Sequence, residues 1–179
     1  MKIINKPIKY KGCEYKNDIL YIYNNIDDEK LDENSEWVIA SITKLFTCIT
    51  LIIMRDKGMI DWNDKVNKYI PHKSRKYKKI KIIDLINHTS GMTRRYHSDR
   101  LREGDIIKNI KYKSASDVVS AIMTKDVELI AHKHGDYKYS NLGYTILGVI
   151  IEKLEEDTYL NVFKKYITDP LNMTQTKLG

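Results

Sequence analysis

The sequence predicts an α+β fold, mostly helical, with a small antiparallel sheet formed by its first part. Before residue 40, β-branched and aromatic residues gather in short runs, of which 19–23 (ILYIY) is the clearest, and such runs favour strands. After residue 40, long apolar segments with helical spacing dominate, at about 42–54 and 142–154. With 42% apolar and 31% charged residues, the composition is that of a globular protein, and we expect a single domain over residues 1–179.

We expect two or three strands before the first helix. The run 19–23 is flanked by Asn17-Asp18 and Asn24-Asn25, and asparagine and aspartate favour turns. A further extended segment at 37–39 (WVI) leads directly into Ser41.

The first helix is predicted to run from about residue 40 to Lys57, with Gly58 as its stop signal. Nine of the thirteen residues in 42–54 are apolar, and they lie on nearly every side of the helix. Since a helix that is apolar all round is a central one, we expect it to be buried.

Ser41 and Lys44 lie three residues apart at the start of this helix, so their side chains share one face. Unpaired backbone N–H groups and the helix dipole favour negative charge at this end, which suits the formation of a serine alkoxide. The alternative is a structural serine, because serine is a common helix N-cap. The Ser-x-x-Lys spacing does not decide between the two, since a chain of 179 residues with nine serines and twenty-five lysines is expected to contain about one such spacing by chance.

Short helices and a basic connection follow. Asp61 is expected to cap a short helix that ends before Pro71. Residues 72–81 are strongly basic and fit a solvated connection between helices better than a nucleic-acid surface. Residues 80–87 have helical spacing and lead into His88. His88 is either a catalytic base or, more often at a helix end, a residue that fixes the turn by hydrogen bonds.

The middle of the chain carries fewer signals. Residues 93–113 are polar and are expected to form a loop with at most one short helix, whereas 116–124 has the pattern of a helix. His132 and His134 are close enough together to suggest a metal site. With no further ligand cluster nearby, a surface turn ending at Gly135 is the better interpretation, and we predict neither metal nor cofactor.

A second apolar helix begins near Leu142. Tyr139 and Asn141 are expected in the loop that leads into its N-terminus. The Tyr-x-Asn spacing is common by chance and also occurs at 23–25. The position of Tyr139 before a helix, and not the spacing itself, makes it a candidate.

Five segments of the chain occur in an order known from one protein family. They are 40–47 (ASITKLFT), 58–71 (GMIDWNDKVNKYIP), 82–92 (IIDLINHTSGM), 135–148 (GDYKYSNLGYTILG) and 169–176 (DPLNMTQT). Taken together over residues 38–176, they resemble the serine β-lactamase-related family, which includes class C β-lactamases, D-alanyl-D-alanine carboxypeptidases and esterases. The resemblance implies a β-lactamase/transpeptidase-like fold.

The resemblance also implies roles for four residues. Ser41 corresponds to the acylated nucleophile, and Lys44 to the cation that assists or takes its proton. Tyr139 corresponds to the partner that helps proton transfer to the leaving group, and Asn141 to the amide that orients Lys44 and the substrate. Lysine and tyrosine are poor bases at neutral pH, but burial lowers the pKa of a lysine and a nearby cation lowers that of a tyrosine. Which of the two is the base stays open.

The chain departs from the family pattern in its last part. The family has a third motif, of Lys-Thr-Gly or His-x-Gly type, on a C-terminal strand that supplies one of two oxyanion N–H donors, and no such motif follows Tyr139. Removing one donor costs about 100- to 1000-fold in turnover. We therefore expect an incomplete domain without the C-terminal strands, and weak activity. Smaller departures are His134 where proline is usual, and Asn172 where glycine is usual.

Two interpretations of function follow. The first is a serine hydrolase of the β-lactamase or penicillin-binding type, which forms an acyl-enzyme on Ser41 with a small molecule or peptide that has a scissile amide, lactam or ester. The second is a catalytically inactive remnant that acts as a binding module or has no function. Strands without their usual partners would leave an exposed sheet edge, through which the chain could self-associate.

Net charge and hydropathy narrow the remaining classes of function and the expected location of the protein. The net charge is +7 and the pI about 9.2, but a nucleic-acid-binding module is the weakest alternative, because charge alone supports it. No apolar run has the length of a membrane span, and residues 1–6 lack the core of a secretory signal, so we expect a cytoplasmic or otherwise intracellular protein. Cys13 and Cys48 form neither a metal spacing nor a disulfide framework, and Cys48 is expected to pack in the core.

Overall fold

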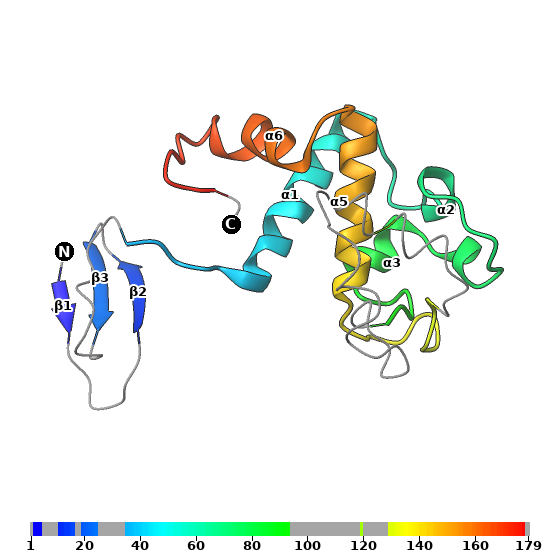
Figure 1. Cartoon of the computed structure of the whole chain (residues 1–179), viewed down its shortest axis with the longest axis horizontal. Coiled ribbons are helices and arrows are strands. Elements are labelled where there is room, and N and C mark those ends of the chain that lie inside the picture. Colours follow the sequence, from blue (N-terminus) through cyan, green and yellow to red (C-terminus); the bar gives the residue numbers. More distant parts are fainter. Residues whose placement is uncertain are drawn as a thin grey trace, which may run out of the picture. The chain divides into compact units, whose positions relative to one another are not determined.

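The computed structural model describes the backbone of residues 2–4, 11–16 and 19–24, and it describes residues 35–93, 119 and 129–177 in full. The chain divides into two compact units, Met1–Ala40 and Ser41–Gly179. The strands belong to the first unit and the long helices to the second (Figure 1).

The first unit contains a three-stranded sheet in the order β1-β3-β2. Its strands are β1 (Lys2–Ile4), β2 (Lys11–Lys16) and β3 (Ile19–Asn24). β2 and β3 pair antiparallel, with Lys16 opposite Ile19, so two residues connect them, as in a tight hairpin. The predicted strand at 19–23 and the antiparallel pairing are confirmed. β1 instead pairs parallel to β3, which is possible because β2 intervenes and gives the chain the length that a parallel crossover needs.

Residues 37–39 do not form a strand. This extended segment leads into the 3₁₀ turn η1 (Ala40–Ile42), which continues as helix α1 (Thr43–Asp56). The predicted first helix is thereby confirmed, with Lys57 as its C-cap residue and Gly58 just beyond it in the left-handed region.

Helix α1 is not buried on all sides, contrary to the expectation from its composition. It packs against α5 (Asn141–Glu155), α6 (Tyr159–Phe163) and the π-helical turn η3 (Lys164–Thr168). The side of α1 that includes Leu51 and Met54 is fully buried, whereas Ile42, Leu45 and Ile52 are exposed. Composition shows how much of a helix surface is apolar, but the neighbours available decide how much of it is covered.

Two short helices lie between α1 and α5 in the sequence. These are α2 (Val66–Tyr69) and α3 (Ile82–Ile86), separated by the 3₁₀ turn η2 (Tyr77–Lys79). The prediction of a helix cap at Asp61 was wrong, because Lys65 is the N-cap residue of α2 and the Asp61 carboxylate accepts a hydrogen bond from the N–H of Asn63 in a preceding turn. Most of the loop expected at 93–113 and of the helix expected at 116–124 lies outside the described residues.

Helix α5 is the centre of the second unit, as the sequence predicted for an apolar helix near Leu142. Its N-cap is Ser140, whose Oγ accepts the Gly143 N–H at 3.0 Å. Asn141 is therefore the first residue of the helix and not part of the preceding loop. The core combines α5 with residues of α1, α2 and α3, among them Leu51, Val66, Ile82, Leu85, Ile146, Leu147 and Ile150. Within the described part of the chain, no helix has the length and apolar character needed to cross a membrane.

Candidate active site

Ser41, Lys44 and Tyr139 lie together in the structure. The Ser41 Oγ is 2.7 Å from the Tyr139 hydroxyl, a normal hydrogen-bond distance between two hydroxyl groups. The Lys44 Nζ donates to the same Ser41 Oγ over a longer distance of 3.4 Å. Three of the four residues selected from the sequence therefore share one small polar cluster, although Tyr139 is 98 positions away from Ser41.

The start of α1 presents Ser41 and Lys44 on the same side. Ala40, directly before the serine, has a φ of 45°, a left-handed conformation that residues with a side chain rarely adopt. This turn takes the backbone from the extended segment 35–39 into η1 and α1. Ser41 is exposed and Lys44 is half-buried, so the serine stays accessible while part of the lysine is shielded from water.

Lys44 is surrounded by aromatic rings. Its Nζ lies 4.9 Å from the ring centre of Tyr139 and 5.5 Å from that of Tyr144, within the range of cation–π attraction. The Tyr144 hydroxyl donates to the backbone carbonyl of Ile86 at 3.0 Å and lies 3.1 Å from the Cys48 Sγ. Burial, and then the hydrogen bond with Cys48, raise the pKa of Tyr144. Tyr144 thus stays a neutral phenol at one side of Lys44, and Cys48 is half-buried rather than fully enclosed in the core.

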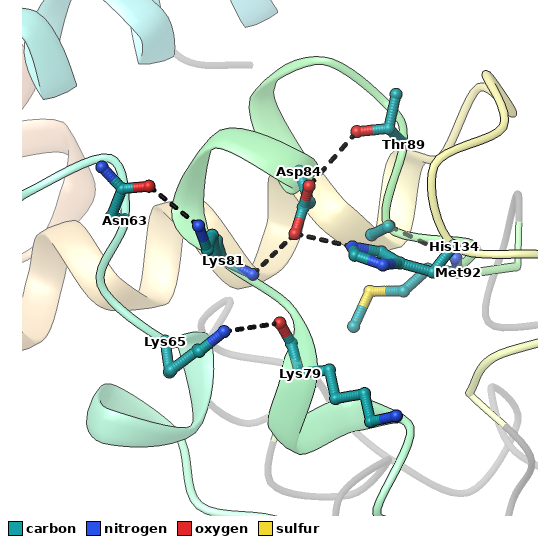
Figure 2. A network of polar contacts seen from close by, with 9 residues as sticks. Asn63, Lys65, Lys79, Lys81, Asp84, Thr89, Met92 and His134 are labelled. Carbon is teal, nitrogen blue, oxygen red and sulfur yellow. Dashed lines mark hydrogen bonds and ion pairs between the residues drawn. The ribbon is translucent and has the colours of Figure 1, made fainter.

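The loop that carries Tyr139 is held by two histidines, His88 and His134. The N–H of Ser140 donates to the Nδ1 of His88 at 3.1 Å, and the N–H of Lys138 donates to the His88 carbonyl at 2.8 Å. Earlier in the same loop, the His134 Nε2 lies 2.8 Å from the Asp84 Oδ2. Figure 2 shows this Asp84 carboxylate between His134, Lys81 and Thr89, so α3 and the turn that follows it anchor both ends of the loop.

Asn141 lies two residues beyond Tyr139, in the first turn of α5. Within the described residues, its side-chain amide makes no hydrogen bond to Lys44. The resemblance-based role of Asn141 as the residue that orients Lys44 therefore stays a prediction. The sequence left the role of His88 open, and its left-handed φ of 59° is a feature that no spacing pattern reveals.

No group of three or more histidine, cysteine, aspartate or glutamate side chains suited to a metal ion occurs within the described ranges. His132 and His134 are exposed, and His134 pairs with Asp84. These two histidines lie in the segment before Gly135, whose φ is 100°.

A helical unit with a serine at the head of its first long helix, and a lysine and a tyrosine beside it, is an arrangement typical of serine hydrolases. The family model described as Beta-lactamase matches residues 8–179. The chain belongs to this beta-lactamase family, which is a family of serine hydrolases with a β-lactamase/transpeptidase-like fold.

Individual relatives agree with this family. Protein flp of Staphylococcus aureus (strain N315) is 34% identical over 166 residues, which cover 87% of this chain and 31% of flp. Penicillin-binding protein 4* of Bacillus subtilis (strain 168) is 30% identical over 166 residues, which cover 90% of this chain and 36% of that protein. The crystal structure of FmtA from Staphylococcus aureus superposes with a TM-score of 0.62 at 25% identity, covering 79% of this chain and 37% of FmtA. The chain thus spans about a third of the length of the curated relatives it matches.

Proposed function

We propose that this chain forms an acyl-enzyme on Ser41 by attack on an amide, lactam or ester carbonyl. The observation that carries the proposal is the contact of one hydroxyl with two proton-handling groups, at 2.7 Å to the Tyr139 hydroxyl and 3.4 Å to the Lys44 Nζ. A serine that served only as a helix cap would not need either contact. Membership of the beta-lactamase family supports the same class of substrate.

In the first step, the Ser41 Oγ forms a bond to the carbonyl carbon while its proton passes to the phenolate oxygen of Tyr139 or to a neutral Lys44 amine. The bond from that carbon to the leaving nitrogen or oxygen then breaks, and the leaving atom receives the proton. In the second step, water adds to the acyl carbon, the bond to Oγ breaks, and Ser41 regains its hydroxyl.

The distances favour Tyr139 as the immediate proton acceptor. Its hydroxyl is 0.7 Å closer to the Ser41 Oγ than the Lys44 Nζ is (3.4 Å minus 2.7 Å), and a hydrogen bond at 3.4 Å is a weak one. Lys44 lies over the Tyr139 ring, where its positive charge would stabilise a phenolate. We therefore assign proton transfer to Tyr139 and electrostatic assistance to Lys44.

We expect acylation by this chain alone to be slow. The 179 residues contain no counterpart of the family's third motif after Tyr139, and one oxyanion donor is worth about 100- to 1000-fold in turnover. Reactive probes are therefore better suited to the test than ordinary substrates.

The test is covalent labelling of the purified chain with a fluorescent penicillin and with a fluorophosphonate. The expected result is one adduct per chain, located by mass spectrometry on the peptide that contains Ser41 and absent from Ser41→Ala. An adduct that persists in Ser41→Ala would show that another residue reacts. If neither probe labels the wild type, the enzyme proposal is wrong, and the second interpretation, a non-catalytic binding module, takes its place.

A further inference from the structure

We propose that His88 is a positioning residue for Tyr139, which holds the tyrosine hydroxyl against Ser41 through a neutral imidazole ring. This inference rests on the proposed acylation of Ser41 and adds to it a residue outside the cluster that contacts the serine.

His88 lies two residues beyond the end of α3 and has a left-handed backbone. Its φ of 59° is in the left-handed region, where a residue with a β-carbon is strained and is kept only by its surroundings. The side chain is only 9% exposed. Ordinary turn formation does not require histidine at such a position, because glycine or asparagine would adopt this backbone with less strain.

The hydrogen bonds of His88 hold the backbone before and after Tyr139. The His88 carbonyl accepts the N–H of Lys138, directly before the tyrosine, and the His88 Nδ1 accepts the N–H of Ser140, directly after it. A single residue therefore fixes the peptide group directly after Tyr139 and the one between Tyr137 and Lys138. Because the backbone is held on both sides, the tyrosine side chain has little freedom except rotation about its own bonds.

The imidazole ring also contacts the tyrosine ring itself. The centres of the His88 and Tyr139 rings are 4.5 Å apart with an angle of 36° between the planes, which is a stacking distance. The centre of the His88 ring also lies 5.1 Å from the ring centre of Tyr144 and 5.9 Å from that of Tyr137. The stack limits the ring rotation of Tyr139 that the backbone bonds leave open.

The arrangement requires an unprotonated Nδ1. A backbone N–H can donate to Nδ1 only if that nitrogen carries a lone pair, so in the neutral ring the proton is on Nε2. Burial, and then the charge of Lys44, lower the pKa of His88 from its ordinary 6.5. The described titratable groups that face the ring are Lys44 from α1, Tyr137 and Tyr139 from the loop, and Tyr144 from α5. None of them would stabilise an imidazolium as a carboxylate would.

Protonation of His88 would turn the Nδ1 into a donor facing the Ser140 N–H and would break this bond. The reaction would then lose the placement of the Tyr139 hydroxyl, and a misplacement of about 1 Å can cost on the order of 100-fold in rate. His88 is thus expected to act on the rate through Tyr139 without contacting the substrate.

The experiment compares three variants of the full chain in penicillin labelling from pH 5 to pH 8. His88→Ala removes the ring and the acceptor and should label about 10- to 100-fold more slowly than the wild type. His88→Asn keeps an acceptor near the Nδ1 position and tolerates a left-handed backbone, so it should recover part of that loss. His72→Asn is the matched control, because His72 also accepts a backbone N–H through Nδ1 and contacts a tyrosine ring, that of Tyr77, but lies in the basic connection.

The pH profile separates positioning from a general effect on the fold. The wild type and His72→Asn should lose labelling rate as the pH falls through the pKa of His88, which lies below the ordinary 6.5, and this acid limb should be absent from His88→Asn, which has no group to protonate at that place. Equal rates for His88→Ala and the wild type, or the same acid limb in His88→Asn, would overturn the proposal. If His88→Ala does not fold, His88→Asn alone decides.

A second measurement, hydrogen exchange, tests the role of His88 independently of the proposed acylation of Ser41. Hydrogen exchange of the Ser140 amide should be slow in the wild type and in His72→Asn, and faster in His88→Ala. If the wild type is not labelled at all but this pattern holds, the acylation proposal fails while the positioning of the loop by His88 stands. If the Ser140 amide exchanges equally in all three proteins, His88 does not hold the loop.

Discussion

The Oγ of Ser41 lies 2.7 Å from the hydroxyl of Tyr139, and this contact joins the start of α1 to the loop before α5. Both residues lie at the N-terminal end of a helix that is anchored in the core. The contact therefore depends on how α1 and α5 pack against each other as much as on the two side chains.

Replacing Tyr139 by phenylalanine should slow the labelling of Ser41 by about 100- to 10,000-fold, the usual contribution of a general acid–base group. The ring and its stacking on His88 would remain, so the thermal stability should change little. The measurement is the second-order rate of labelling by a fluorescent penicillin, with Tyr77→Phe as the control at a buried tyrosine away from the site. A rate within threefold of the wild type would assign proton transfer to Lys44 instead.

Alanine at Gly91 should destabilise the protein more than alanine at Gly58. The two glycines have nearly the same φ, 75° and 73°, so both substitutions carry the strain of about 1–2 kcal/mol that a left-handed residue costs. A β-carbon at Gly91 would lie 2.5 Å from the carbonyl oxygen of His132, whereas one at Gly58 would meet nothing within 4 Å. The difference between the two free energies of unfolding, measured in urea, should be at least about 1 kcal/mol. Equal losses would mean that the segment around His132 moves away without cost.

Replacing Tyr77 by phenylalanine should leave the free energy of unfolding unchanged or increase it by about 1 kcal/mol. The Tyr77 side chain is fully buried and its hydroxyl is the one such buried side-chain group without a hydrogen-bond partner in the described part of the chain. Removing an unpaired buried hydroxyl removes a desolvation cost. Tyr159→Phe is the matched variant, because the Tyr159 hydroxyl lies 2.8 Å from the Thr47 Oγ1, and it should cost about 0.5–1.5 kcal/mol. The free energies of unfolding of both variants, measured in urea, check which substitution costs more stability.

Glutamine at Glu155 should lower the stability at pH 7. Burial raises the pKa of Glu155, but hydrogen bonds from Lys165 and Tyr166 outweigh it, and the net pKa lies below the ordinary 4.5. A carboxylate with a lowered pKa stabilises the folded state above the ordinary pKa, and this contribution is lost as the pH falls through the lowered value.

The difference in melting temperature between the wild type and Glu155→Gln should therefore shrink on acidification below pH 4.5. Asp56→Asn serves as the control, since the Arg55–Asp56 pair is exposed and surface ion pairs contribute little. A gap that stays constant from pH 7 to pH 3 would show that Glu155 acts through packing alone.

The motif order, through the family that it resembles, selected Ser41, Lys44 and Tyr139, and the structure places these three side chains in one cluster, while their roles stay predictions. Local patterns also located α1, α3, α5 and strand β3. They did not predict the parallel pairing of β1, since pairing between distant segments leaves no local signal. The short helix expected from Asp61 begins later because Asp61 satisfies the backbone of its own turn, a competition that aspartate often wins.

The exposure of α1 and the role of His88 could not be predicted for different reasons. The apolar composition of α1 shows how many of its side chains could be buried. Which of them are buried depends on the neighbouring elements, and the sequence of α1 does not specify those. The position of His88 depends on a single left-handed residue and on hydrogen bonds to Lys138 and Ser140, about fifty positions further along the chain. Spacing within a short motif does not contain that information.

The turn η1 and helix α1 form one continuous element, which carries Ser41 and Lys44 at its beginning and the fully buried Leu51 and Met54 further along. During evolution, this one rigid helix is therefore under selection for the site at its start and also for the core packing of its later residues. A substitution that shifts the buried end by a fraction of an ångström also moves Ser41, so a core mutation here should change the rate of the proposed acylation before it changes the stability. A library that varies only the buried residues of α1 should accordingly yield variants that differ in reactivity while every residue of the site is intact.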